Sequence, residues 1–157
     1  MEAILHEKRF PELTVDELYG LLKARSEVFV VEQDCVYQDL DGDDQDSVHL
    51  WLTVGDSIVA LCRVCPAGTH MEEVSIGWVV TTVRGQGYGK RIMLEGIRAA
   101  REHFGAVRID IEAQEYARGF YERVGFRQSS APFLLDGIPH IRMRWHPEAR
   151  NNPAEPL

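Results

Sequence analysis

Three glycines occupy alternate positions in the stretch TTVRGQGYGKR, and two basic residues flank them. Gly85, Gly87 and Gly89 lack a Cβ, so main-chain N–H groups there can approach a ligand closely. The helical pattern that follows adds the partial positive charge of a helix N-terminus, and Arg84 and Lys90 add formal charge. The stretch therefore predicts an anion site, and pyrophosphate is the expected ligand.

Two familiar nucleotide motifs do not fit this stretch. A P-loop requires G-x-x-x-x-G-K-(S/T), but Arg91 follows the Gly89-Lys90 pair. The dinucleotide fingerprint G-x-G-x-x-G fails because Gly89 comes one residue too soon after Gly87. The pattern that remains is R-x-x-G-x-G, and the alternative to a ligand site is a simple turn into a helix.

A second pattern lies downstream in the segment AQEYARGFYERVGF. Ala117, Phe120, Tyr121, Gly125 and Phe126 match A-x-x-F-Y-x-x-x-G-F. With the pattern R-x-x-G-x-G before it, the chain resembles the GNAT superfamily of acyl-CoA N-acyltransferases, whose pyrophosphate loop reads (Q/R)-x-x-G-x-(G/A). The stretches RSEVFVVEQDCVYQDLDGDD and DGIPHIRM, together with a histidine at position 49, are similar to the ElaA-like branch of that superfamily.

The resemblance implies a function, a fold and a set of cofactor contacts. The function is transfer of an acetyl group from acetyl-CoA to an amine acceptor, and the alternative is a catalytically silent acyl-CoA-binding sensor or regulatory module. The fold is a mixed α/β (α+β) domain with a twisted, mostly antiparallel sheet that is splayed at its centre and flanked by helices. The implied cofactor-binding residues are Val79, Val80, Thr81, Arg84, Gly85, Gln86, Gly87, Tyr88, Gly89, Lys90, Gln114, Ala117 and Phe120.

The chain departs from the family pattern at three points. Trp78 stands where the ElaA-like branch commonly has arginine, and Gln114 stands where many GNAT proteins have asparagine. The link between IGWVV and VRGQG is also short for the family. These departures affect the expected shape of the pantetheine and acceptor sites more than the identity of the cofactor.

Acyl transfer from a thioester to an amine needs a polarised carbonyl, a protonated leaving thiolate and a deprotonated amine. The resemblance places the pantetheine arm against the strand that ends Val79-Val80-Thr81, whose N–H groups would polarise the carbonyl. A free donor there requires a bulge or a splay in the strand. Tyr121 is the predicted general acid for the thiolate, and the alternative is a tyrosine packed in the core beside Phe120.

The general base is less well specified by the sequence. An alkylamine has a pKa of about 10.4 and is protonated at neutral pH, so a base must take its proton. Glu32, His49 and Glu73 are the candidates, and a chain of water molecules is another. For each of these three residues, the alternative to a catalytic role is a surface or structural role.

The loop DCVYQDLDGDDQDS is rich in aspartate. Calcium is not expected, because the glycine of Asp39-x-Asp41-Gly42 comes two positions too early for an EF-hand. The loop is predicted to be either a solvated turn with Asx hydrogen bonds or a lip that attracts a cationic acceptor. Cys62 and Cys65 fall on an expected strand, so they are interpreted as small buried residues, and no metal is predicted.

Composition narrows the class of partner and the location. The chain has 157 residues and a formal net charge of −8, which argues against generic nucleic-acid binding. No apolar run approaches the ~20 residues of a membrane helix. Three cysteines and an N-terminus without a signal-peptide core favour the cytoplasm. The expected partner is a small-molecule or protein amine, and a homodimer is left open.

Periodicity predicts a single domain over residues 1–145 and a frayed tail over 146–157. The order of elements is one helix, a β-hairpin, a strand, a helix, a strand, a short helix and two strands. The expected helices cover residues 13–33, 88–104 and 115–124, and the expected strands cover 48–54, 57–64, 71–80, 106–113, 126–130 and 138–145. Asp136-Gly137 is the turn signal before the last strand.

Overall fold

The computed structural model describes residues 2–35 and 39–147. Within them, eight strands form one sheet with three α-helices and several short helical turns. The elements are β1 (Ile4–Arg9), η1 (Phe10–Glu12), α1 (Val15–Ser26), η2 (Glu27–Glu32), η3 (Asp44–Asp46), β2 (Val48–Val54), β3 (Ser57–Cys65), β4 (Ser75–Thr81), α2 (Tyr88–Phe104), β5 (Ile109–Gln114), η4 (Glu115–Ala117), α3 (Arg118–Arg123), β6 (Arg127–Gln128), β7 (Phe133–Leu135) and β8 (Ile138–Trp145).

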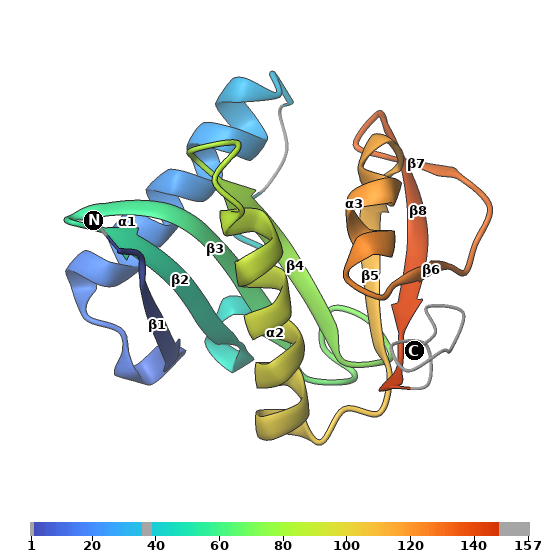
Figure 1. Cartoon of the computed structure of the whole chain (residues 1–157), viewed down its shortest axis with the longest axis horizontal. Coiled ribbons are helices and arrows are strands. Elements are labelled where there is room, and N and C mark those ends of the chain that lie inside the picture. Colours follow the sequence, from blue (N-terminus) through green and yellow to red (C-terminus); the bar gives the residue numbers. More distant parts are fainter. Residues whose placement is uncertain (1, 36–38, 148–157) are drawn as a thin grey trace.

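The strands follow the order β1-β2-β3-β4-β5-β8-β6, with β7 also paired to β8. Every neighbouring pair is antiparallel except β4 and β5, which run parallel. That parallel pair is joined at one register position, Ser75 opposite Asp110, and the two strands then separate (Figure 1). The predicted mostly antiparallel sheet with a central splay is therefore confirmed.

The start of α1 and both ends of α2 lie where the local sequence predicts. Thr14 caps α1 in a capping box, because its hydroxyl accepts from Glu17 N at 3.0 Å and the Glu17 carboxylate accepts from Thr14 N at 2.9 Å. Gly87 precedes α2 and Gly105 follows it, both with left-handed backbones at φ 77° and φ 60°. Figure 1 shows α1 and α2 on opposite faces of the strands β2 to β4.

The first predicted helix is divided in the structure. α1 is regular up to Ser26, and the chain continues as the π-helix η2 over Glu27–Glu32. A π-helical turn contains one residue more than an α-helical turn, and such turns are frequent at functional sites. Periodicity alone could not separate the two segments, because both present apolar residues at similar spacing.

The strand prediction missed β1 and β7, and it began β4, β5 and β6 too early along the chain. β1 was missed because it is an edge strand without alternating burial, although it pairs with β2 along its whole length. The predicted strand 126–130 is reduced to β6, and β7 was not predicted. Asp136-Gly137 does form a turn, but it joins β7 to β8, with both residues at positive φ.

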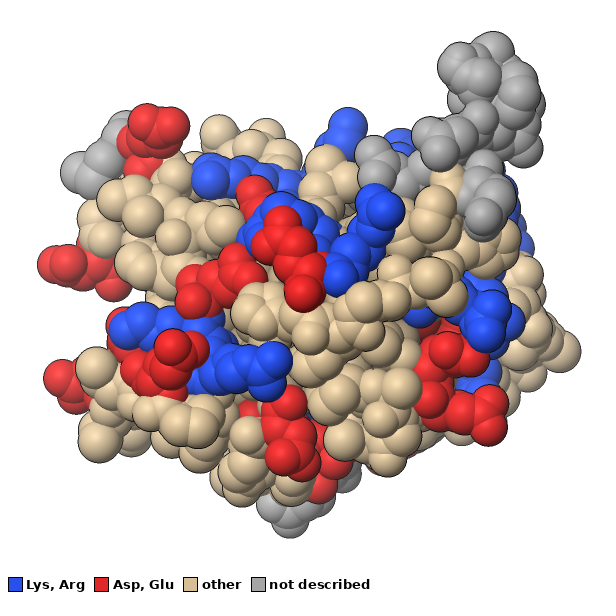
Figure 2. Space-filling model, turned by 90° about the horizontal axis from the view of Figure 1, so that it is seen from below, with Lys and Arg blue, Asp and Glu red and all other residues tan. Residues whose placement is uncertain are grey.

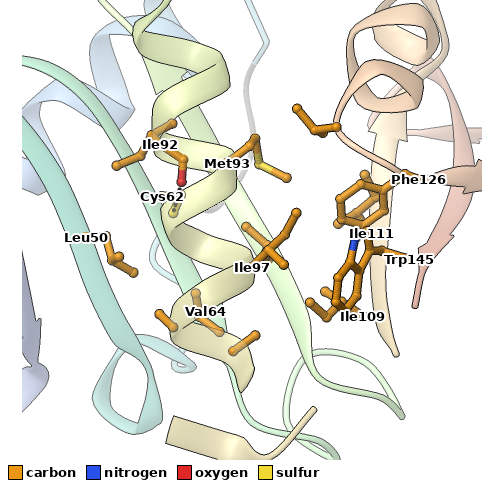
Figure 3. Close-up of a cluster of buried hydrophobic side chains, with 14 of the residues drawn as sticks. Leu50, Cys62, Val64, Ile92, Met93, Ile97, Ile109, Ile111, Phe126 and Trp145 are labelled. Atoms are coloured by element: carbon orange, nitrogen blue, oxygen red, sulfur yellow. Dashed lines mark hydrogen bonds between the residues drawn. The ribbon is translucent and has the colours of Figure 1, made fainter. Parts of the chain in front are cut away.

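One hydrophobic core runs beneath α2 and continues under the joined ends of β4 and β5. Ile92, Met93 and Ile97 of α2 belong to the same buried cluster as Ile109 and Trp145 from the other half of the sheet (Figure 3). A second, smaller cluster packs α1 against the opposite face of the sheet and includes Leu21, Trp51 and Val80. The closed end of the sheet is therefore fixed by packing, while the splayed end is open.

Acidic and basic side chains are mixed over the face seen in Figure 2. Ion pairs at the surface, such as Arg108–Glu73 at 3.2 Å and Arg98–Glu7 at 2.6 Å, place opposite charges next to each other. No helix among the described residues is long and apolar enough to span a bilayer. Of the predicted tail 146–157, residues 148–157 lie outside the described part of the chain.

Candidate active site

A bulge in β4 opens the centre of the sheet. Leu61 of β3 pairs with Val80 and Arg63 pairs with Gly77, so Cys62 faces two residues of β4, Trp78 and Val79. Trp78 has φ 52°, a left-handed backbone that is rare for a large side chain. The bulge predicted for the pantetheine strand is therefore present, and it bends β4 where β4 leaves β5.

The separation of β4 and β5 creates a cleft of about 740 Å³. One wall is the β4 edge, which beyond Ser75 has no ladder partner among the described strands on its β5 side. Residues of β5, β8, α3 and η2 supply the other walls. The predicted site residues that line the cleft are Glu32, Val79, Val80, Thr81, Arg84, Gly89, Gln114, Ala117, Phe120 and Tyr121.

The glycine turn lies at the open end of this cleft. Gly85 and Gly87 have φ 81° and φ 77°, the region that L side chains rarely adopt. A Cβ on Gly89 would lie 3.3 Å from Thr81 Cγ2 and 3.5 Å from the Phe120 ring. The three glycines therefore meet two different requirements, a left-handed turn and a close approach.

Arg84 is held in this turn by two contacts. Its Nε donates to Thr81 Oγ1 at 3.3 Å, and its Nη2 lies 3.2 Å from Glu32 Oε2. Both charged side chains are more than half exposed, so this ion pair is weak and a phosphate can replace the carboxylate. Gly85, Gln86, Gly87, Tyr88 and Lys90 are not among the residues lining the cleft, and the Tyr88 side chain packs against the core.

Tyr121 projects from α3 into the cleft wall. Its ring packs edge-on against Phe120 at 5.0 Å and against Phe126 at 6.2 Å between ring centroids. Burial raises the pKa of the Tyr121 hydroxyl well above its usual range, so the phenol keeps its proton. The sequence left open whether Tyr121 packs in the core or faces the active site. In the structure its ring packs against Phe120 and Phe126 and also lines the cleft.

The three predicted base candidates do not meet in one place. Glu32 lines the cleft. His49 is 5% exposed, lies outside the cleft lining, and its Nε2 is 2.9 Å from the carbonyl of Asp44. Burial lowers the pKa of His49. Glu73 also lies outside the cleft and pairs with Arg108 at 3.2 Å, so the geometry supports neither His49 nor Glu73 as the base.

The aspartate loop is organised by two arginines that are each 2% exposed. Arg25 pairs with Asp39 at 3.1 Å and with Asp44 at 2.8 Å, while Arg63 pairs with Asp41 at 2.8 Å and with Asp44 at 3.1 Å. The prediction of a solvated turn is wrong for Asp44, which is 6% exposed. The predicted Asx turn is present at Asp41, which is exposed and whose Oδ1 accepts a hydrogen bond from Asp43 N at 3.0 Å.

The same two arginines support Trp78. The Cζ atoms of Arg25 and Arg63 lie 4.9 Å and 5.5 Å from the Trp78 ring centroid, and Phe29 packs edge-on at 5.0 Å. These contacts stabilise the left-handed backbone at the bulge. Hydrogen bonds from Arg63 lower the pKa of Asp41 to about 2, although burial opposes the shift. The acidic loop therefore acts as the outer layer of the cleft wall.

A pair of glutamine side chains crosses the cleft opposite this wall. Gln33 Nε2 donates to Gln114 Oε1 at 3.3 Å, and Gln114 Nε2 donates to Gln33 Oε1 at 3.2 Å. Nearby, Cys35 Sγ lies 3.6 Å from the carbonyl of Asp136 in the β7–β8 turn. The segment after η2 thus connects the two halves of the splayed sheet. Gln114 was predicted as a cofactor contact, and its partner Gln33 was not.

Comparison with known proteins gives a consistent assignment. Residues 11–147 match the Acetyltransferase (GNAT) domain family. Protein ElaA of Escherichia coli is 38% identical over 136 residues, which cover 84% of this chain and 89% of ElaA. This chain belongs to the GNAT acetyltransferase family.

Solved GNAT structures agree with the fold described above. A crystal structure of an acyl-CoA N-acyltransferase from Pseudomonas aeruginosa matches with a TM-score of 0.86 and 37% identity, covering 92% of this chain and 99% of that chain. The crystal structure of Escherichia coli ElaA matches with a TM-score of 0.86 and 34% identity, covering 92% and 100%. GNAT proteins use acyl-CoA and act on amine acceptors.

Three polar residues of this GNAT cleft were not singled out in the sequence. Glu112 of β5 lies 3.2 Å from His70 Nε2, and His140 of β8 lines the same cleft. The hydrogen bond from His70 lowers the pKa of Glu112, and the same bond raises the pKa of His70. Alternation along IDIEAQ could have indicated that Glu112 and Gln114 share a face, but His70 lies in a loop and gives no pattern.

The structure gives no support to a metal or redox site at the cysteines. Cys62 is buried on β3 and its Sγ lies 3.8 Å from the carbonyl of Ile92, while Cys65 Sγ lies 3.2 Å from Ser47 Oγ. Burial raises the pKa of both thiols, so they stay protonated. Asp41, Asp43 and His70 do converge within 4.8 Å, but Arg63 already occupies both Asp41 oxygens at 2.8 Å and 2.9 Å.

Proposed function

We propose that this GNAT protein is an N-acetyltransferase that moves an acetyl group from acetyl-CoA to an amine by direct attack on the thioester. One observation carries the proposal. A single cleft combines a bulged β4 edge that has no ladder partner on its β5 side beyond Ser75 among the described strands, a glycine turn before a helix N-terminus and a partly buried, protonated tyrosine. These features match the amide-bearing arm, the pyrophosphate and the leaving thiolate of acetyl-CoA.

Each part of the cofactor has a distinct partner. The pyrophosphate takes main-chain donors of residues 85–90 at the start of α2, with charge from Arg84 and Lys90. The pantetheine amides pair with the β4 edge that has no further ladder partner among the described strands, as an added strand would. The thioester carbonyl accepts from main-chain N–H groups at or after the bulge, over Val79–Thr81, and these donors stabilise the oxyanion of the tetrahedral intermediate. Gln114, Ala117 and Phe120 line the opposite wall.

Tyr121 is the general acid in this mechanism. As the C–S bond breaks, the Tyr121 hydroxyl gives its proton to the sulfur and the product thiol leaves neutral. The burial that raises the pKa of Tyr121 also makes the departing thiolate more basic, so the two groups remain matched inside the cleft. The phenol is therefore protonated before each turnover, as a general acid must be.

The acceptor is a small-molecule or protein amine that reaches the thioester from the polar side of the cleft. Glu112 and Asp136 line the cleft, so a positively charged amine that enters it finds carboxylates there. The three cysteines are free thiols, which favours a reducing compartment, and we place the reaction in the cytoplasm.

Two measurements test the function. Calorimetry should show acetyl-CoA binding to the wild-type protein, and Gly87→Asp should weaken it more than tenfold, because the carboxylate competes with phosphate for the same N–H groups and repels its charge. Gly105→Asp, at the other end of α2 with the same sign of φ, is the control for backbone strain. Equal affinities in folded Gly87→Asp and wild type would refute the cofactor site.

The second measurement separates an enzyme from a silent binding module. Release of free thiol from acetyl-CoA is followed with a panel of diamines, aralkylamines, amino acids and lysine peptides. Amine-dependent release with an acetylated product, identified by mass spectrometry, supports the transferase. Acetyl-CoA binding without release for any amine supports the sensor instead.

A further inference from the structure

His140 occupies a defined position on the polar side of the cleft. It belongs to β8, is 7% exposed and lines the cleft. Its Nδ1 lies 2.7 Å from the carbonyl oxygen of Ile138. A carbonyl only accepts hydrogen bonds, so Nδ1 carries the proton and the neutral ring has its lone pair on Nε2.

Strand geometry directs this ring away from the hydrophobic core. His140 pairs with Gln114, and the residues before and after it on β8 point to the opposite face. Ile141, Met143 and Trp145 fill the core, so His140 points away from the core with Arg142. Phe133 stacks on the imidazole with ring centroids 6.2 Å apart and 30° between planes, which restrains the orientation of the ring.

Charged groups that line the cleft with His140 or contact Glu112 come from four elements. Glu112 is the diagonal neighbour on β5, and the charges of Glu112 and His140 attract each other. Arg142 on β8 lies 4.0 Å from Glu112, His70 in the β3–β4 loop lies 3.2 Å from the same carboxylate, and Asp136 lines the cleft from the β7–β8 turn. A positively charged acceptor amine that approaches the ring therefore meets carboxylates from two of these elements, Glu112 and Asp136.

We propose that His140 is the general base that deprotonates the acceptor ammonium at Nε2. This inference rests on the proposed acetyl transfer. One proton passes from the ammonium to Nε2, and the neutral amine then forms a bond to the thioester carbon. The C–S bond breaks, the sulfur takes the Tyr121 proton, and the second nitrogen proton returns the phenol to its starting form. The products are the amide, the free thiol and one proton on His140, which passes to solvent.

The test compares three histidine variants in the amine-dependent thiol-release assay across pH. His140→Gln should lower kcat by ~10²–10⁴-fold, the range for loss of a general base, and should remove the acidic limb of the pH profile. Acetyl-CoA affinity should remain within about twofold of wild type, because the base acts on the acceptor. His103→Gln changes an exposed histidine that pairs with Glu7 outside the cleft lining, and it should keep the wild-type kcat and acidic limb.

The outcomes separate this inference from the proposed function. An active wild type whose acidic limb persists in His140→Gln overturns the inference, and so does loss of that limb in His70→Gln alone. Nitrogen NMR of the wild-type ring decides the case even if the variant fails to fold or no acceptor is acetylated. A proton on Nδ1 with an unprotonated Nε2 supports the assignment, and the opposite tautomer overturns it. Failure to acetylate any amine counts against the proposed function.

Discussion

Replacing Asp44 with asparagine tests whether the buried ion network stabilises the cleft wall. The Asp44 Oδ1 accepts from Arg25 at 2.8 Å and from Arg63 at 3.1 Å, and both guanidinium groups are almost fully buried. Asparagine keeps the shape and one oxygen acceptor but removes the charge. A charge-assisted hydrogen bond contributes about 1.5–3 kcal/mol and a neutral one about 0.5–1.5 kcal/mol, so two such exchanges cost about 2–3 kcal/mol.

For a chain of this length a loss of 2–3 kcal/mol lowers Tm by about 4–12 °C. Urea unfolding followed by far-UV circular dichroism gives the free energy directly. Asp46→Asn is the matched control, because Asp46 lies in the same short turn, makes the same charge change and is exposed, so its effect should stay within about 0.5 kcal/mol. Equal stabilities of the two variants would refute the idea that the network holds the wall.

Three further predictions follow from the site. Tyr121→Phe should lower kcat by ~10²–10⁴-fold in the thiol-release assay with little change in acetyl-CoA affinity, and unchanged turnover would leave the residue a packing role only. Gly89→Val should destabilise the protein by about 1–3 kcal/mol and weaken acetyl-CoA binding, because its Cβ would crowd Thr81 and Phe120; a more stable variant would contradict the close approach. The pKa of Asp41 falls from its ordinary value of 3.8 to about 2 on folding, so the stability that ionised Asp41 contributes is present above pH 3.8 and is lost as the pH falls through about 2. Asp41→Asn should therefore reduce the loss of unfolding free energy between these two pH values. An identical pH dependence in the variant and the wild type would count against this role of Asp41.

Local features of the cleft were predictable because they depend on residues close together in sequence. The left-handed turn before α2 requires glycine at positions 85 and 87, and the residue types of Thr14 and Glu17 predict the capping box of α1. The splay of the sheet was expected only from the family resemblance, since hydrophobic periodicity does not show where two parallel strands separate. Edge strands such as β1 lack the alternation that reveals a strand with one buried face.

The electrostatic wall and the proposed base, His140, could not be predicted in the same way. Arg25 was an isolated polar residue on an apolar helical face, and only the fold brings Asp44 and Trp78 to it. His140 looked like an ordinary strand residue, because its tautomer depends on hydrogen bonding to Ile138 and its neighbours come from β5 and the β3–β4 loop. Such sites are set by contacts between distant segments, which spacing does not encode.

The two halves of the sheet are joined by one β4–β5 pairing, so a small rotation at this joint changes the distance between the far ends of the two strands. Six residues of β4 extend beyond Ser75, a length of about 20 Å at ~3.3 Å per residue. A rotation of about 5° at the joint therefore moves the far end by nearly 2 Å, and a displacement of ~1 Å can cost ~10²-fold in rate. Ile109 and Trp145, which pack at this joint, therefore influence the width of the cleft. In the proposed acetyl transfer, side-chain volume at the closed end of this sheet therefore influences the rate without any contact to the reacting atoms.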